Sequence, residues 1–173
     1  MLHYTNHTDK ELVKKSLDAI AEYGTWEDLD RIGFVRITDD EELIVPLVRT
    51  IAKVGRVGED DYMLSSYIHA TKHNLSNSTY IEILEAINKL STEVKDEYPQ
   101  IIRLLNKADT PDDPLLKTLV KTLARFGTHE NVEDFNKFLR NYNHANDFIN
   151  QGKTTPEVIK HAIQVIIDNI KDK

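Results

Sequence analysis

Two histidines, His69 and His73, are spaced four residues apart and would share one face of a helix that contains them. Imidazoles at this spacing can hold zinc when a third ligand arrives from another helix. No glutamate lies between them in a metalloprotease arrangement, and no carboxylate pair stands beside them. We therefore interpret both as solvated side chains at a polar helix end, and we predict no metal and no cofactor.

Other patterns typical of catalysis are missing from the sequence. Cysteine is absent, which excludes disulfides, thiolate catalysis and cysteine-ligated zinc or iron–sulfur clusters. The glycines of Gly55-Arg56-Val57-Gly58 have the wrong spacing for a phosphate-binding loop. Neither residues 39–42 nor 59–61 have the spacing of a calcium loop. We predict that the protein is not an enzyme.

Composition and charge narrow the class of protein further. Of the 173 residues, 29% are charged and 40% hydrophobic, as in ordinary globular proteins, and this length predicts one domain. The net charge of -7 argues against binding to nucleic acid, which needs a basic face. No basic region followed by an apolar run opens the chain, and no apolar stretch approaches the ~20 residues that span a bilayer. We expect a soluble, acidic, cytoplasmic protein without membrane contact.

Apolar residues recur with helical period along almost the whole chain, as in Leu43, Leu47, Ile51 and Val54. The one candidate strand, Phe34-Val35-Arg36-Ile37, is short and is interpreted as a loop, so the predicted fold class is all-α. Helix starts are indicated by capping boxes that begin at Thr8, Thr38, Thr79 and Thr154. A weaker box begins at Thr110, with Pro114 in the first helical turn.

A two-helix unit repeats four times. Its first helix, helix A, ends in similar pentapeptides: IAEYG at 20–24, IAKVG at 51–55, INKLS at 87–91 and LARFG at 123–127. A glycine there predicts a residue with positive φ after the helix, which makes Ser91 an exception. Shorter B helices are expected at 26–32, 62–68, 94–105 and 132–142. A loop-like stretch at 141–153 then leads to a helix at 155–170, whose wide apolar surface suits a cap packed on two sides.

Residues 115–132, LLKTLVKTLARFGTHENV, resemble the HEAT-like (armadillo-type) repeat family. The shared pattern is an apolar pair, a basic residue, a small residue near the hairpin, a glycine and an acidic turn. Pro46 within a first helix is similar to the proline that many such repeats carry. The resemblance covers about residues 9–140. It implies a right-handed α-solenoid of about four helical-hairpin repeats, at 9–37, 38–75, 76–109 and 110–143, with a C-terminal capping helix in 144–173.

Two enzymatic branches of the family provide the alternative function. His129-Glu130 is similar to one dipeptide of deoxyhypusine hydroxylase, a di-iron enzyme that needs several such dipeptides on facing helices. HEAT-like DNA glycosylases need a cationic concave track, whereas here the basic residues expected on B helices alternate with acids and aromatics. Trp26 shares its helical period with Leu29 and Ile32, which favours a place in the core.

The family resemblance implies a binding scaffold with the B helices on its concave surface. We therefore predict a non-enzymatic scaffold or adaptor that binds another protein there. The partner-binding positions are the polar ones between the core residues of the B helices: Arg31, Ser66, His69, Gln100, Arg103, Asn136 and Arg140. Four tyrosines on B-helix patterns suit either the edge of the core or an interface: Tyr62, Tyr67, Tyr98 and Tyr142.

Acidic clusters at the expected helix N-termini suggest a second binding surface. A ridge containing Asp60, Asp61, Asp112 and Asp113 would bind a partner with a basic segment. Carboxylates are also favoured at helix N-termini by the helix dipole, which provides a purely structural explanation of the same pattern.

Overall fold

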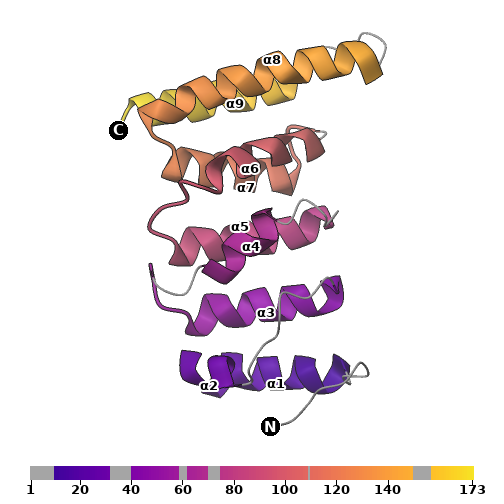
Figure 1. Ribbon diagram of the computed structural model, residues 1–173, viewed down its shortest axis with the longest axis vertical. Helices are drawn as coiled ribbons and strands as arrows, with labels where there is room; N and C mark the ends of the chain where they lie inside the picture. The colour runs from indigo at the N-terminus through magenta and orange to yellow at the C-terminus, as the bar shows by residue number, and fades with distance from the viewer. Residues whose placement is uncertain (1–9, 32–39, 59–61, 70–74, 109, 150–156) are drawn as a thin grey trace. The chain divides into compact units, whose positions relative to one another are not determined.

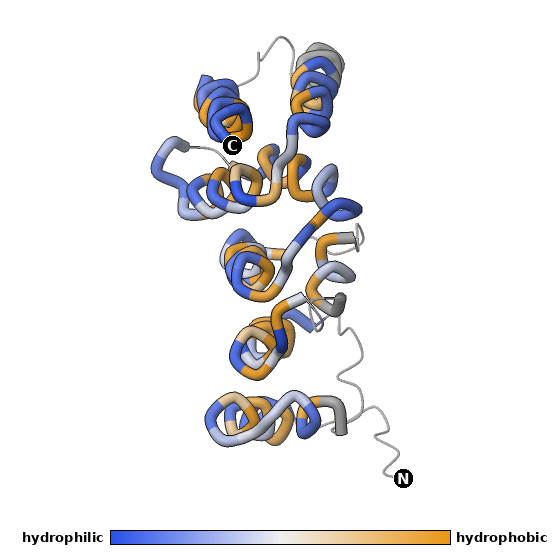
Figure 2. Tube along the Cα trace, turned by 90° about the vertical axis from the view of Figure 1, so that its left-hand side faces the viewer, coloured by the Kyte–Doolittle hydropathy of each residue, from blue (hydrophilic) through white to orange (hydrophobic). Residues whose placement is uncertain are grey.

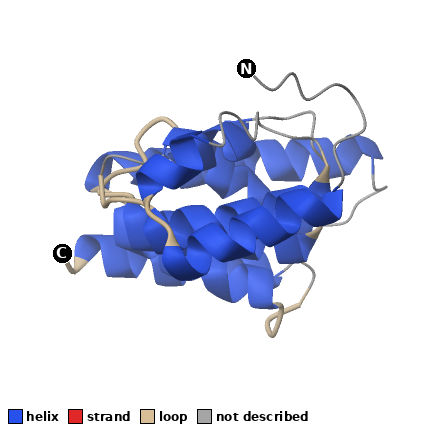
Figure 3. Cartoon of the chain, turned by 90° about the horizontal axis from the view of Figure 1, so that it is seen from below, coloured by secondary structure: helices blue, strands red, loops and turns tan. Residues whose placement is uncertain are grey.

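The computed structural model of the protein describes residues 10–31, 40–58, 62–69, 75–108, 110–149 and 157–173 (Figure 1). Within these ranges, the side chains of residues 30–31, 62–63, 69 and 141–149 are not described. All regular elements of the described residues are helices, which confirms the all-α fold class (Figure 3). The possible strand at residues 34–37, interpreted above as a loop, lies outside the described residues.

The chain divides into two compact units, Met1–Thr92 and Glu93–Lys173. The expectation of a single domain stays a prediction.

The first unit is built on three long helices, α1 (Lys10–Tyr23), α3 (Glu41–Val54) and α5 (Asn77–Leu90). Helix α3 packs against both α1 and α5, while the short α2 (Trp26–Arg31) contacts α1 and α3 (Figure 1). The short α4 (Tyr62–His69) packs on α5. In the repeat predicted from the sequence, the three long helices are A helices and the two short ones are B helices.

The core of the first unit follows the apolar stripes of these helices. Figure 2 shows hydrophobic and hydrophilic stretches alternating along each helix, as amphipathic packing requires. The fully buried side chains include Leu17, Ile44, Leu47, Ile51, Tyr67, Ile83 and Ile87. Trp26, predicted to be core, is half-buried, whereas Leu29 beside it is buried.

Pro46 lies inside α3, as expected. Proline has no backbone N–H to donate, so the helix lacks one backbone hydrogen bond at this position. One turn later, the buried Thr50 hydroxyl contacts the Pro46 carbonyl oxygen at 2.9 Å and the Leu17 carbonyl oxygen at 3.2 Å. The second contact joins α3 to α1.

The second unit contains α6 (Tyr98–Arg103), the 3₁₀ turn η1 (Leu104–Lys107), α7 (Pro114–Phe126), the 3₁₀ turn η2 (His129–Asn131), α8 (Val132–Ile149) and α9 (Glu157–Lys171). Helix α7 contacts α6 and α9, and α8 contacts the same two helices. Six apolar residues of α9 are buried: Ile159, Ala162, Ile163, Ile166, Ile167 and Ile170. The predicted helix at 155–170, packed on two sides, is thus observed as α9.

Helix α8 corrects the sequence-based prediction for residues 141–153. These residues were expected to be mainly loop, but α8 continues to Ile149, so the boundary between residues 143 and 144 falls inside a helix. The asparagines in this stretch suggested a loop. However, Tyr142, Ala145 and Phe148 recur at three-residue intervals, as in a helix. Residues 141–151 also contain no glycine or proline that would end the helix. The helical period was therefore the better signal.

Some helix starts also differ from prediction. Thr79 was expected to cap a helix, but α5 begins earlier, and its cap is Ser76, whose hydroxyl accepts a hydrogen bond from the Thr79 amide. Four cap-forming residues in succession, Ser76-Asn77-Ser78-Thr79, made the start ambiguous, and the earlier cap adds a turn of helix. The cap of α3 is Asp40, while Thr8, Thr38 and Thr154 lie outside the described residues. Pro114 lies in the first turn of α7, as predicted, but the cap of this helix is Asp113 and not Thr110.

The residues that follow the long helices do not take positive φ, so that expectation was wrong. Gly55, Ser91 and Gly127 have φ of -69°, -78° and -64° and are extended. Serine is therefore accommodated at 91 without strain. At Gly127 the reason for glycine is close packing. A Cβ there would lie 2.5 Å from Ile170 Cδ1, 2.7 Å from the Leu123 carbonyl oxygen and closer still to Tyr98 Oη.

Candidate functional site

All seven predicted partner-binding residues lie on the short helices or on α8. Arg31 ends α2, and Ser66 and His69 belong to α4, all in the first unit. Ser66 is half-buried, while the side chains of Arg31 and His69 lie outside the described set. The other four, Gln100, Arg103, Asn136 and Arg140, belong to the second unit.

The structure brings these four onto two helices that pack together. Gln100 and Arg103 lie on α6, and Asn136 and Arg140 lie on α8, which contacts α6. Arg103, Asn136 and Arg140 are exposed, and Gln100 is half-buried. We call this set the α6–α8 surface, which is defined by Gln100, Arg103, Asn136 and Arg140.

The two arginines of the α6–α8 surface differ in their surroundings. Arg103 Nη1 donates to the neutral Gln100 Oε1 at 3.0 Å, so this contact leaves its positive charge uncompensated. Arg140 Nη2 instead donates to the Glu133 carboxylate at 2.6 Å. Hydrogen bonds from Arg140 and then Asn136 hold the pKa of Glu133 below its usual value. Glu133 was not among the predicted residues, although its seven-residue spacing from Arg140 places both on one helix face.

Buried aromatic residues fix α6 against its neighbours. The ring of Tyr98 on α6 meets Phe135 on α8 edge-on, with centroids 6.1 Å apart. The Tyr98 hydroxyl donates to the Leu123 carbonyl oxygen of α7 at 2.8 Å. Burial, followed by the nearby Asp134 charge, raises the pKa of Tyr98. Tyr98 and Tyr67 are both almost fully buried and act as core residues, the first of the two interpretations given above.

The acidic residues of the described helix starts make hydrogen bonds within the fold. The Asp113 carboxylate accepts from the Leu115 amide at 2.8 Å, and Asp112 pairs with Lys117 at 3.2 Å. In the first unit, the Glu41 carboxylate of α3 accepts from the Ser76 amide at 2.8 Å and from the Thr79 hydroxyl of α5. Hydrogen bonds from Ser76 and Thr79 lower the pKa of Glu41. Asp60 and Asp61 lie outside the described residues.

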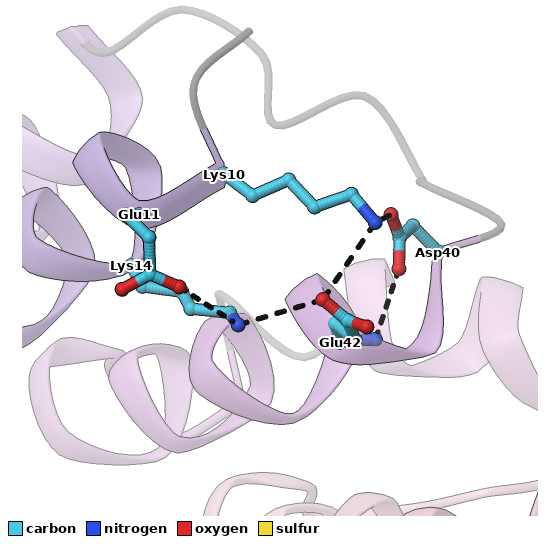
Figure 4. A network of polar contacts seen from close by, with 5 residues as sticks. All are labelled: Lys10, Glu11, Lys14, Asp40 and Glu42. Atoms are coloured by element: carbon cyan, nitrogen blue, oxygen red, sulfur yellow. Dashed lines mark hydrogen bonds and ion pairs between the residues drawn. The ribbon is translucent and has the colours of Figure 1, made fainter.

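Ion pairs also connect the long helices of the first unit. Lys10 of α1 pairs with Asp40 and lies 3.6 Å from Glu42, while Lys14 reaches both Glu11 and Glu42 (Figure 4). The pair with Lys10 lowers the pKa of Asp40 and raises that of Lys10. Further along, Arg49 of α3 pairs with Glu82 of α5.

The predicted histidine sites can be checked only in part. His129 and Glu130 are exposed in the 3₁₀ turn η2, which confirms their expected place in the hairpin turn. His73 lies outside the described residues. Among the described residues, no three His, Asp or Glu side chains come together as a group that could hold a metal ion.

These features define, for the described residues, an all-α protein with exposed polar side chains on the contacting helices α6 and α8. Comparison of the chain with protein-family models, with curated proteins and with solved structures found no match. Across the described residues, every helix is too short or too polar to cross a membrane.

Proposed function

We propose that the protein is a non-enzymatic protein-interaction scaffold of the HEAT-like type, and that it binds a protein partner on its B-helix surface. In this proposal the chain is a right-handed α-solenoid of about four hairpin repeats, closed by α9, in the cytoplasm. The α6–α8 surface is the part of the binding surface for which side-chain contacts are known.

The packing of helices within each unit supports the repeat architecture. In the first unit, A helices pack on A helices in the order α1, α3, α5. In the second, the B helices α6 and α8 contact each other. Stacked hairpins make such contacts because each repeat buries its apolar faces against the next one.

The observation that carries the binding proposal is the exposure of Arg103, Asn136 and Arg140 on two helices that contact each other. Arginine is enriched at the energetic centres of protein interfaces, because its planar guanidinium makes several directed hydrogen bonds. The acidic ridge is the weaker candidate. The Asp113 carboxylate already accepts a hydrogen bond from the Leu115 amide at the start of α7.

The test is affinity capture from native lysate with the wild type and with the double variant Arg103→Glu/Arg140→Glu. We expect the variant to lose the partner. Its midpoint of thermal unfolding should stay close to that of the wild type, because exposed ion pairs such as Arg140–Glu133 contribute little to stability.

The matched control is Lys53→Glu/Lys89→Glu, which makes the same charge change at exposed positions on α3 and α5. Partner capture should survive in this control. Capture that survives in the α6–α8 variant, or that is lost equally in both variants, would contradict the assignment of the surface.

The alternative function, a HEAT-like enzyme or nucleic-acid-binding protein on the same scaffold, has its own test. Metal analysis of the purified protein and a DNA mobility assay at low salt distinguish it from a protein scaffold. Bound iron or zinc, or tight DNA binding despite the net charge of -7, would favour the alternative.

A further inference from the structure

Helix α7 carries a row of cations along its exposed face. Lys117, Lys121 and Arg125 follow each other at four-residue intervals, and all three are exposed. Four residues of α-helix rise about 6 Å, so the row extends about 12 Å. No acidic residue occurs in α7, although the whole chain has a net charge of -7.

The corresponding positions of the other long helices differ. Alignment on the pentapeptides that end each helix A places Lys14, Asp18 and Glu22 of α1, Val45, Arg49 and Lys53 of α3, and Ile81, Glu85 and Lys89 of α5 at these positions. Only α7 among these four helices has a cation at all three. The row is therefore a property of α7 and not of the repeat.

The helix dipole explains only one end of the row. A cation in the last turn, such as Arg125, is stabilised by the partial negative charge at the helix C-terminus. Lys117, near the beginning of the same helix, gains no such stabilisation. The Arg125 guanidinium also lies 4.8 Å from the centre of the Phe126 ring, which holds it at the surface.

Neighbouring carboxylates in the described residues neutralise little of the charge of Lys117 and Lys121. Arg49 of α3 pairs with Glu82 of α5, whereas among the described residues the partner of Lys117 is Asp112, whose side chain is 97% exposed. Lys121 forms no ion pair with any residue in the described part of the chain. At the C-terminal end of α7, Lys173 Nζ donates to the carbonyl oxygens of Arg125 and Gly127 at 2.6 and 3.0 Å, which adds a fourth cation.

We propose that this α7 ridge, defined by Lys117, Lys121, Arg125 and Lys173, docks an acidic helical segment of a partner protein. Carboxylates spaced four residues apart on such a segment repeat every 6 Å, the interval of the cations. Each exposed ion pair is weak, but several in a row attract and orient an acidic helix in a salt-dependent manner. Nucleic acid is disfavoured, because four cations neutralise few phosphates while the rest of the chain repels them.

The probe is a fluorescein-labelled, alanine-based helical peptide of about 16 residues with glutamate at every fourth position. A peptide with glutamine in place of glutamate is the ligand control. Fluorescence anisotropy at low and physiological ionic strength measures binding to the full chain. We expect the glutamate peptide to bind, the glutamine peptide not to bind, and added salt to weaken the complex.

The variant Lys117→Glu/Lys121→Glu should weaken peptide binding by about tenfold or more. The control Lys53→Glu/Lys89→Glu makes the same charge change on α3 and α5 and should bind like the wild type. Circular dichroism verifies that both variants remain folded. The α7 ridge shares no residue with the α6–α8 surface, so we expect Arg103→Glu/Arg140→Glu to retain peptide binding.

Five results would overturn the proposal. They are failure of the wild type to bind at low ionic strength, unchanged binding of the Lys117→Glu/Lys121→Glu variant, equal binding of the glutamine peptide, equal loss of binding in the α3/α5 control, and tighter binding of a single-stranded oligonucleotide of the same charge.

Discussion

Replacing Gly127 with alanine tests whether close packing, and not backbone conformation, explains the glycine after α7. The φ and ψ of Gly127, -64° and 143°, are accessible to alanine. The new methyl group, however, would lie against Tyr98 Oη, 2.5 Å from Ile170 Cδ1 and 2.7 Å from the Leu123 carbonyl oxygen. The Ile170 terminus can move aside, but the carbonyl belongs to the backbone, and the buried Tyr98 hydroxyl is tied to that same carbonyl.

The expected loss follows from two opposing effects. Overpacking a core typically costs about 1–3 kcal/mol. Replacing glycine by alanine reduces the entropy of the unfolded chain, which returns about 0.4–1 kcal/mol. We therefore expect Gly127→Ala to lower the free energy of unfolding by about 1–2 kcal/mol. Gly55→Ala, at an extended glycine with φ of -69°, reports the backbone part of the change.

The assay is urea denaturation followed by circular dichroism, with a double-mutant cycle against Tyr98→Phe. Tyr98→Phe alone should cost about 1 kcal/mol, because a buried hydrogen bond is lost while Leu123 keeps the Gly127 amide as a donor. In the double variant the hydroxyl no longer meets the new methyl group, so the loss should be smaller than the sum by about 1 kcal/mol. A fully additive cycle, or a Gly127→Ala protein as stable as the wild type, would refute the reasoning.

Three further predictions concern pH and shape. Because the pKa of Tyr98 is raised in the folded protein, its contribution to stability is complete below pH ~10 and is lost as the pH rises above that value. Tyr98→Phe should therefore reduce the fall in unfolding free energy at alkaline pH. An equal fall in the wild type and the variant would count against this prediction. The pKa of Glu41 is lowered in the folded protein, so its contribution to stability is lost as the pH falls and not as it rises. Glu41→Gln should lower the free energy of unfolding by about 1 kcal/mol at neutral pH, and this difference from the wild type should vanish in urea titrations as the pH falls through the lowered pKa. A difference that persists in acid would be inconsistent with this prediction. Finally, if the proposed solenoid of four repeats is right, small-angle scattering should give a radius of gyration well above the ~16 Å of a compact globule of this length. A value near ~16 Å would argue against the solenoid.

The sequence predicted most helices because their apolar periods are strong. The ends of α3, α5 and α7 were visible in the repeated pentapeptides, and the wide apolar surface of residues 155–170 indicated a helix packed on two sides. These signals are local, and the buried side chains follow them closely.

Features that depend on contacts between helices were not predictable in the same way. Gly127 was predicted from the sequence to have a positive φ, but the reason for glycine at this position is close packing. The sequence does not reveal that Tyr98 and Ile170 approach it. The prediction that Thr79 caps a helix was wrong because several adjacent residues can cap a helix equally well, and Ser76 is the one that does. The predicted site residues do lie on helices, and the spacing of Arg140 and Glu133 places both on one helix face, but the sequence does not show that their side chains pair.

The most direct test of the binding proposal is photo-cross-linking of the captured complex from single positions. A photoreactive amino acid replaces Asn136 on the α6–α8 surface or, as a control, Glu85 on α5; both positions are exposed. The account predicts that the partner is cross-linked from position 136 and not from position 85. Cross-linking from 85 with none from 136 would contradict it.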